Sequence, residues 1–396
     1  MTLEPNGFIG AAMGVQGITD ATVVLHGQNG CRKGLMISQK LLVRSEPRDG
    51  RFYAGDSAMP YTDVRPEDYY ADTAKKLSDT LQHVNEEGYG LIAVMCSPGV
   101  SIVGDDLERL AGSRERIMTL ESDLLPPDAY GGFDRCMSNI LGFLSPAGGT
   151  KRPESVNILG LSIMHKDWGS FRHELSHLLK DAGFDVACTL GAGCTVSEIE
   201  RSANSSFNII IDPGCARETA ALYEKTYGIP SISIGKCPIG FDATEELMRR
   251  IEDATGRPLT HGLSMLKKSR RRGYDGVVAS GKDLTGSTFS IVAPESTSVP
   301  LRDWLTDSFG MVECGDRPDF LFAPGDMARL EEASGGCGKG VDIGFPSSYG
   351  SDFLKKPLMG LEGAMYLLDA LFNRVKITAI TGITDSSYYS VKTWKH

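Results

Sequence analysis

The chain has 396 residues and a mass of 42.7 kDa, which is more than one hydrophobic core usually supports, so two or three domains are expected. Charged residues make up 23% of the chain and the formal net charge is -10, a balance that disfavours broad nucleic-acid binding. The sequence has no run of about eighteen apolar residues and no basic amino-terminal segment leading into an apolar run. These features predict a globular cytoplasmic protein without a signal peptide or membrane span.

Short apolar runs rich in β-branched residues alternate along the chain with amphipathic segments of helical period. This alternation predicts strand–helix–strand units whose parallel sheets are buried on both faces. The predicted strands are residues 22–26, 91–95, 156–162, 184–189, 207–211, 230–234, 288–293 and 319–323. The predicted helices are residues 67–86, 104–112, 170–182, 215–227, 243–254 and 361–374.

Clusters of glycine, proline and polar residues predict where the chain divides into compact units. They occur at residues 146–155 and 256–273. We therefore predict an α/β fold of three Rossmann-like domains with parallel sheets, at residues 1–150, 151–262 and 263–396. No repeat of fixed period is present, so a solenoid is not expected.

Two of the nine cysteines directly follow predicted strands. Cys31 comes after strand 22–26 and a glycine-rich turn, and Cys96 follows strand 91–95. An odd number of cysteines in a long chain does not predict a disulfide framework. In doubly wound sheets, ligands gather beyond the carboxyl ends of strands, and thiolates are suitable ligands for iron–sulfur clusters. Position alone favours the simpler interpretation, in which each cysteine is a small buried hydrophobic residue.

Four segments resemble those of a known family. Residues 26–31, HGQNGC, are similar to the H-G-x-x-G-C segment of nitrogenase component 1 proteins, and residues 96–106 to their C-P-x-x-x-x-G-D-D segment. Residues 227–240 resemble the family's "fGiP" and "PiGi" pattern, and residues 359–364 its terminal "G-y-E-G-A" segment. From the order and spacing of these segments, the chain is identified as a member of the nitrogenase component 1-type oxidoreductases.

The resemblance implies that Cys31 and Cys96 bind an iron–sulfur cluster. The family usually has a third cluster cysteine ahead of the Cys31 position, where this chain has residues 5–8 and no cysteine. Two thiolates cannot complete the four-ligand shell of a [4Fe–4S] cluster, so the cluster would be shared across a homodimer or with a related chain. Cys215 lies near the family's cofactor cysteine. It is expected to face the substrate cavity, to ligate a second metal centre, or only to begin a helix.

The resemblance also implies an anaerobic, two-component, ATP-dependent reductase. The short length and the two early cysteines most resemble the catalytic subunit of nickel-sirohydrochlorin a,c-diamide reductive cyclase, which implies a tetrapyrrole substrate of F430-type biosynthesis. No G-x-x-x-x-G-K-[ST] phosphate loop is present, so a partner resembling the nitrogenase iron protein would use the ATP. The alternatives are a metallocluster assembly scaffold of the same superfamily and a non-catalytic partner subunit. The sequence does not identify the catalytic proton donor.

Two further patterns have simpler interpretations. Residues 173–177 match H-E-x-x-H, which can hold zinc on one face of a helix. They lie on a predicted crossover helix without a third ligand at the usual spacing, so a solvated helix face is expected. The basic run 267–272 is likewise expected to be solvated.

Overall fold

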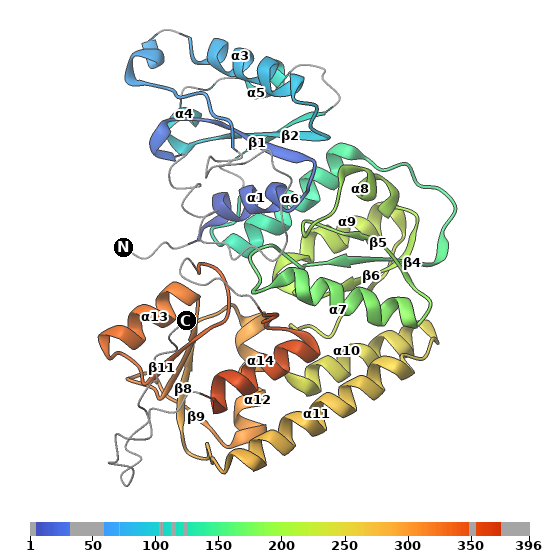
Figure 1. Cartoon of the computed structure of the whole chain (residues 1–396). Helices are drawn as coiled ribbons and strands as arrows, with labels where there is room; N and C mark the ends of the chain where they lie inside the picture. The colour runs from blue at the N-terminus through green and yellow to red at the C-terminus, as the bar shows by residue number, and fades with distance from the viewer. Residues whose placement is uncertain are drawn as a thin grey trace, which may run out of the picture.

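The computed structural model describes residues 5–31, 59–70, 72–102, 104, 106–111, 116–121, 125–347 and 354–373. Three parallel β-sheets with helices packed against them form the molecule (Figure 1). The predicted α/β fold with parallel sheets is therefore confirmed, while the domain limits remain predictions. None of the described helices combines the length and apolar character that a membrane crossing requires.

The first sheet has the strand order β1-β2-β3. Its strands and the helices around it are α1 (Gly7–Gln16), β1 (Ala21–His26), η2 (Pro66–Tyr70), α3 (Thr73–Glu86), β2 (Leu91–Cys96), α4 (Pro98–Ser101), α5 (Leu107–Ala111), β3 (Ile117–Leu120) and α6 (Ala129–Leu144). The apolar side of α3 packs on one face of the sheet through Leu77, Leu81 and Val84. The opposite face packs with α1 and α6 into the main core of the molecule.

The second sheet has the order β5-β4-β6-β7, and all of its strands are parallel. Its elements are β4 (Arg152–Leu159), α7 (Trp168–Asp181), β5 (Asp185–Thr189), α8 (Val196–Ser202), β6 (Ser205–Ile210), η4 (Pro213–Cys215), α9 (Arg217–Tyr227), β7 (Ser231–Ile232) and α10 (Gly240–Thr255). Because the strands are parallel, the segments that follow β4, β6 and β7 all leave the same edge of the sheet.

The third sheet has the order β11-β10-β8-β9. Its elements are α11 (Thr260–Ser280), β8 (Thr288–Ile291), α12 (Glu295–Phe309), β9 (Val312–Glu313), β10 (Phe320–Ala323), α13 (Gly325–Ser334), β11 (Lys339–Asp342) and α14 (Gly360–Phe372). Most of the predicted break at 256–273 is helical, because its polar residues form the exposed surface of α11. The basic run 267–272 lies on this helix, mostly exposed as predicted, although Arg270 pairs with Asp242 and Glu245 of α10.

Helices α1 and α6 cross at the centre of the molecule, and the sequence predicts neither. Nearly all of α1 is buried, so its sequence has no polar face and no helical period. Glycines allow the two helices to touch: a Cβ on Gly10 would lie 1.9 Å from the Ala129 carbonyl oxygen. A Cβ on Gly132 would lie 2.2 Å from the Gly7 carbonyl oxygen. This close crossing links the first sheet to the second, because α6 also packs against α9.

Candidate functional site

The two predicted cluster cysteines lie at one edge of the first sheet. In the parallel pairing of β1 and β2, His26 is the register partner of Cys96, and the Ser97 N–H donates to the His26 carbonyl at 2.9 Å. Cys31 follows β1 in a short helical turn, where its N–H donates to the Gln28 carbonyl at 3.1 Å. Cys96 is 6% exposed and Cys31 is half-buried. Their role as cluster ligands stays a prediction.

The backbone around this edge is open at two glycines. Among the residues that the structure describes, a Cβ on Gly30 would meet no atom within 4 Å, and a Cβ on Gly99 would meet only the Tyr69 hydroxyl, at 3.8 Å. A bulky inorganic group needs such close approach to the backbone. Cys31 and Cys96 would supply one half of a four-thiolate shell.

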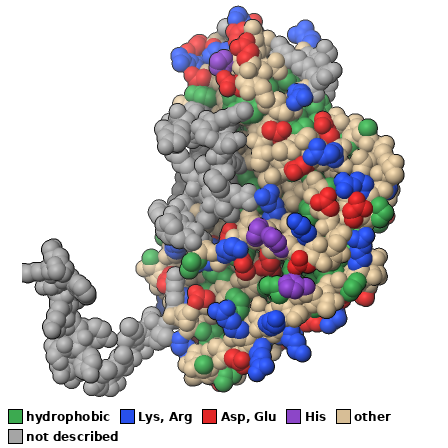
Figure 2. All heavy atoms as spheres, turned by 45° about the vertical axis from the view of Figure 1, so that its right-hand side comes forward, with side chains coloured by type: hydrophobic (Ala, Val, Ile, Leu, Met, Phe, Trp, Pro, Cys, Tyr) green, Lys and Arg blue, Asp and Glu red, His purple; other side chains and the backbone are tan. Residues whose placement is uncertain are grey.

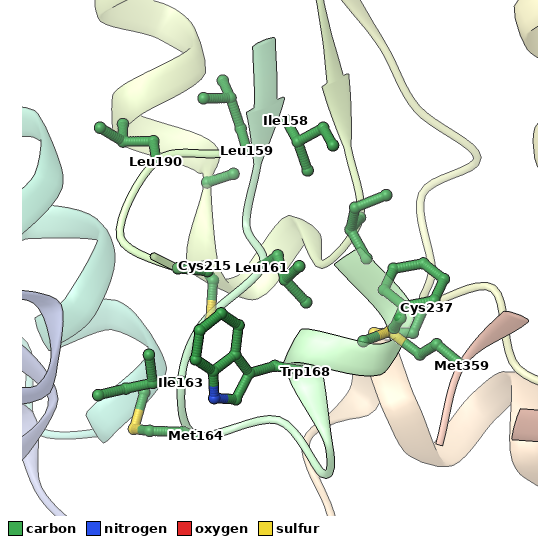
Figure 3. Close-up of a cluster of buried hydrophobic side chains, with 14 of the residues drawn as sticks. Ile158, Leu159, Leu161, Ile163, Met164, Trp168, Leu190, Cys215, Cys237 and Met359 are labelled. Atoms are coloured by element: carbon green, nitrogen blue, oxygen red, sulfur yellow. The ribbon is translucent and has the colours of Figure 1, made fainter. Parts of the chain in front are cut away.

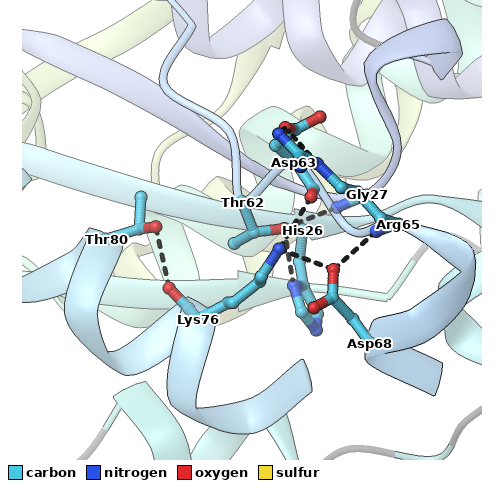
Figure 4. Close-up of polar contacts among 8 residues, drawn as sticks. All are labelled: His26, Gly27, Thr62, Asp63, Arg65, Asp68, Lys76 and Thr80. Carbon is cyan, nitrogen blue, oxygen red and sulfur yellow. Dashed lines mark hydrogen bonds and ion pairs between the residues drawn. The ribbon is translucent and has the colours of Figure 1, made fainter. Parts of the chain in front are cut away.

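Hydrogen bonds hold the segment 59–65 across the end of β1 (Figure 4). The Thr62 hydroxyl accepts the Gly27 N–H at 3.0 Å and lies 3.0 Å from Nδ1 of the buried His26 ring. Asp68 accepts the Arg65 N–H at 2.7 Å and pairs with the Lys76 ammonium at 2.5 Å. The hydrogen bond from Lys76 holds the pKa of Asp68 below its usual value. These contacts fix the start of the turn that carries Cys31.

A second group of potential ligands lies at the carboxyl edge of the second sheet. His165 follows β4, Asp212 follows β6 and Cys237 follows β7, and one ligand atom of each lies within 4.8 Å of the others. The His165 Nε2 atom is 3.1 Å from Asp212 Oδ2. Asp212 and Cys237 are fully buried, and His165 is 7% exposed. Figure 3 shows Cys237 within the apolar cluster around these residues, together with Trp168.

The surroundings tune two of these groups in opposite directions. Burial is the largest influence on Asp212 and favours a raised pKa, but the hydrogen bond and charge of His165, together with the Gly214 N–H, hold the pKa below its usual value. The other oxygen, Oδ1, accepts the Gly214 N–H at 2.8 Å. Burial, and then the Asp212 carboxylate, raise the pKa of the Cys237 thiol well above its usual value. The site therefore combines a stabilised carboxylate with a thiol that stays protonated without a cation nearby.

Cys215 lies close to this group but is not part of it among the described residues. It ends the 3-10 turn η4, one helical turn after Asp212 in sequence, and its side chain is buried in the apolar cluster of Figure 3. Burial, and then the Asp212 carboxylate, raise the pKa of its thiol well above the usual value. Helix α9 begins two residues later, at Arg217. A ligand role for Cys215 stays a prediction.

The H-E-x-x-H motif has a structural role on α7. His173 and His177 are exposed, with ring centroids 4.3 Å apart, and Figure 2 shows histidine side chains at the surface among acidic and basic ones. Glu174 instead accepts the N–H groups of Leu361 at 2.7 Å and Glu362 at 3.0 Å. It thus caps α14, whose own N-cap residue makes no side-chain cap hydrogen bond. Burial raises the pKa of Glu174 to about 7.

The sequence patterns did not single out His165, Asp212 or Cys237 as potential ligands. The signal that singled out Cys31 and Cys96 also applies to them, because each follows the carboxyl end of a parallel strand. Five and four residues separate His165 and Cys237 from their strand ends, and neither has the glycine-rich turn and the family resemblance that drew attention to Cys31. Only the folded sheet brings the three side chains together.

The chain belongs to the nitrogenase component 1 type oxidoreductase family, whose model matches residues 7–312. The nitrogenase iron-molybdenum cofactor biosynthesis protein NifE of Methanococcus maripaludis is 24% identical over 294 residues, 71% of this chain and 58% of that protein. One light-independent protochlorophyllide reductase subunit, from Rhodopseudomonas palustris (strain BisA53), is 25% identical over 273 residues, 63% of this chain and 48% of that protein. The chain thus spans about half the length of these curated relatives.

A solved structure supports the fold over nearly the whole chain. The structure "Nitrogenase Cp1 at pH 5" superposes with a TM-score of 0.74, covering 96% of this chain and 90% of that chain. The sequence identity is 18%, so this likeness concerns the fold.

Proposed function

We propose that this chain is the catalytic component of a two-component, ATP-dependent reductase that relays electrons through a [4Fe–4S] cluster to a bound substrate. The observation that carries the proposal is the pairing of β1 with β2, which brings Cys31 and Cys96 to one sheet edge in a member of an oxidoreductase family. When bound, the cluster would supply one-electron transfer. Each chain offers two thiolates, so we propose that a homodimer, or a pair with a related chain, completes the four-ligand shell.

The chain's own residues would orient the two cysteines. Thr62 holds the backbone at Gly27, and the strand pairing holds His26 beside Cys96. These contacts limit the motion of the turn that leads to Cys31. A cysteine-bearing segment that is already fixed before the cluster binds loses less conformational entropy on binding.

We propose a tetrapyrrole as the substrate and a reductase resembling the nitrogenase iron protein as the ATP-using partner, both acting in an anaerobic cytoplasm. Two observations support the substrate class. The name of one curated relative is that of a protochlorophyllide reductase subunit. The two early cysteines also resemble those of the catalytic subunit of nickel-sirohydrochlorin a,c-diamide reductive cyclase.

A second candidate function is a metallocluster assembly scaffold. The similarity to NifE, a cofactor biosynthesis protein, supports it, because that alignment covers 71% of this chain. A non-catalytic partner subunit is a third candidate. In that case the purified chain would not hold a complete cluster by itself.

Turnover separates these candidates. The reconstituted protein would be mixed under anaerobic conditions with an iron-protein-type reductase, ATP and a tetrapyrrole, and reduction followed by absorbance. We expect ATP-dependent reduction that is lost in Cys31→Ser and kept in the half-buried control Cys314→Ser. Transfer of the cluster to an acceptor protein without turnover would instead identify a scaffold and refute the reductase proposal.

A further inference from the structure

We infer that His165, Asp212 and Cys237 bind one divalent transition-metal ion, of the kind represented by zinc, ferrous iron and cobalt. The site goes beyond the proposed electron relay. It lies at the carboxyl edge of the second sheet, whereas Cys31 and Cys96 lie at the edge of the first. Its existence does not depend on a cluster at the first edge.

The three donor types select the class of ion. An imidazole nitrogen, a carboxylate oxygen and a sulfur suit zinc and neighbouring transition metals, whereas magnesium and calcium prefer oxygen ligands alone. Three protein ligands leave a fourth tetrahedral position open for water or a substrate atom, as in catalytic zinc sites. Bond lengths of about 2.0–2.3 Å put tetrahedral ligand atoms roughly 3.3–3.8 Å apart. The present atoms lie within 4.8 Å, so small side-chain rotations bring them into range.

The ring nitrogen of His165 that would not bind the metal, Nδ1, already has backbone hydrogen-bond partners. Its Nδ1 atom lies 3.0 Å from the Ser162 backbone nitrogen and 3.2 Å from the Ser162 carbonyl oxygen. Without a metal, Nδ1 accepts the Ser162 N–H, and Nε2 donates to Asp212. With a metal on Nε2, the ring proton moves to Nδ1 and donates to the Ser162 carbonyl. A bond from the second ring N–H to a carboxylate, a backbone carbonyl or water orients nearly all metal-binding histidines.

Charge and burial also favour a cation at this position. Among the described residues, Asp212 accepts hydrogen bonds from His165 and Gly214 and forms no ion pair with a lysine or arginine. One divalent ion beside the carboxylate and the Cys237 thiolate makes the group neutral, which offsets the cost of burying separate charges. The Cys237 thiol, which also lies 3.7 Å from the Thr297 hydroxyl, adds a sulfur donor beside the histidine–aspartate pair. The Tyr130 ring packs edge-on against His165, with centroids 5.9 Å apart, and helps to fix the imidazole.

Cobalt(II) is a direct probe of this site, because a thiolate bound to cobalt gives a charge-transfer absorption band. The starting protein is the full-length chain with Cys31→Ala and Cys96→Ala, which removes the thiols of the first edge. We expect about one cobalt per chain, measured by absorption and by metal analysis after gel filtration. Adding Cys237→Ser should abolish the thiolate band, and adding His165→Ala should weaken binding at least about tenfold. The matched control Cys314→Ser, a thiol outside the site, should change neither.

The inference is overturned if the folded starting protein binds no cobalt, or if the thiolate band survives in Cys237→Ser. Circular dichroism identifies variants that do not fold. If the Cys237→Ser or His165→Ala variant does not fold, X-ray absorption of the zinc-loaded starting protein gives the ligand shell directly. One sulfur with two or three nitrogen or oxygen ligands supports the site, and a shell without sulfur refutes it.

Discussion

The crossing of α1 and α6 leads to a quantitative prediction for Gly10→Ala. The new Cβ would lie 1.9 Å from the Ala129 carbonyl oxygen, whereas real Cβ contacts essentially never fall below 3.0 Å. The two helices must therefore separate by about 1 Å in a core packed to near-crystalline density. Overpacking of this kind costs about 1–3 kcal/mol, and here the obstacle is backbone, which gives way less than a side chain. The better helix propensity of alanine offsets up to about 1 kcal/mol. We expect a net loss of about 2 kcal/mol in the free energy of unfolding.

Gly142→Ala is the matched control for this change. Gly10 lies inside α1 and Gly142 lies inside α6, so both are helical glycines. Gly142, however, is exposed, and a Cβ there would meet no described atom within 4 Å. This variant should gain about 0.5–1 kcal/mol from helix propensity. Urea unfolding followed by circular dichroism measures both values. If Gly10→Ala is as stable as Gly142→Ala, the close crossing of the helices is wrong.

Two further predictions concern Glu174 and Thr62. The pKa of Glu174 is raised from 4.5 to about 7, so its contribution to stability is present below about pH 4.5 and is lost as the pH rises through about 7. The unfolding free energy of wild type minus that of Glu174→Gln should thus fall by up to about 3 kcal/mol between about pH 4.5 and about pH 8. A difference that does not change with pH would contradict this. Thr62→Val leaves the buried Gly27 N–H without its acceptor and should lower the free energy of unfolding by about 1–3 kcal/mol. Thr62→Ser keeps the hydroxyl and should restore this stability. Equal stability of the two variants would exclude this role of the hydroxyl.

Much of the fold follows from local sequence patterns. All eight predicted strands are present, because continuous apolar runs bounded by polar turns mark buried parallel strands. The missed strands β3, β9 and β11 are short, and β9 and β11 lack a continuous apolar run. Among the described helices, the sequence did not predict α1, α4, α6, α8, α11, α12 and α13, and the reason is plain for two of them. Helix α1 lacks a polar face because it is buried all round, and α11 is rich in polar residues that resemble a linker.

The candidate site was only partly predictable. The glycine-rich turn before Cys31 and the strand before Cys96 pointed to one sheet edge, and the pairing of β1 with β2 agrees with that inference. The group of His165, Asp212 and Cys237 depends on the order of strands in the second sheet. That order places β4 beside β6 and β6 beside β7, although helices separate all three in sequence. No local pattern reports such neighbours.

Iron binding at the first sheet edge decides whether Cys31 and Cys96 hold a cluster. Wild type, Cys31→Ala, Cys96→Ala and the control Cys314→Ala would be purified without oxygen, reconstituted, and compared by iron and sulfide analysis and by electron paramagnetic resonance after reduction. We predict about one four-iron cluster per dimer in wild type and control, and none in the two edge variants. A folded wild type that binds no iron after reconstitution, or edge variants that keep the full cluster, would contradict the proposed electron relay.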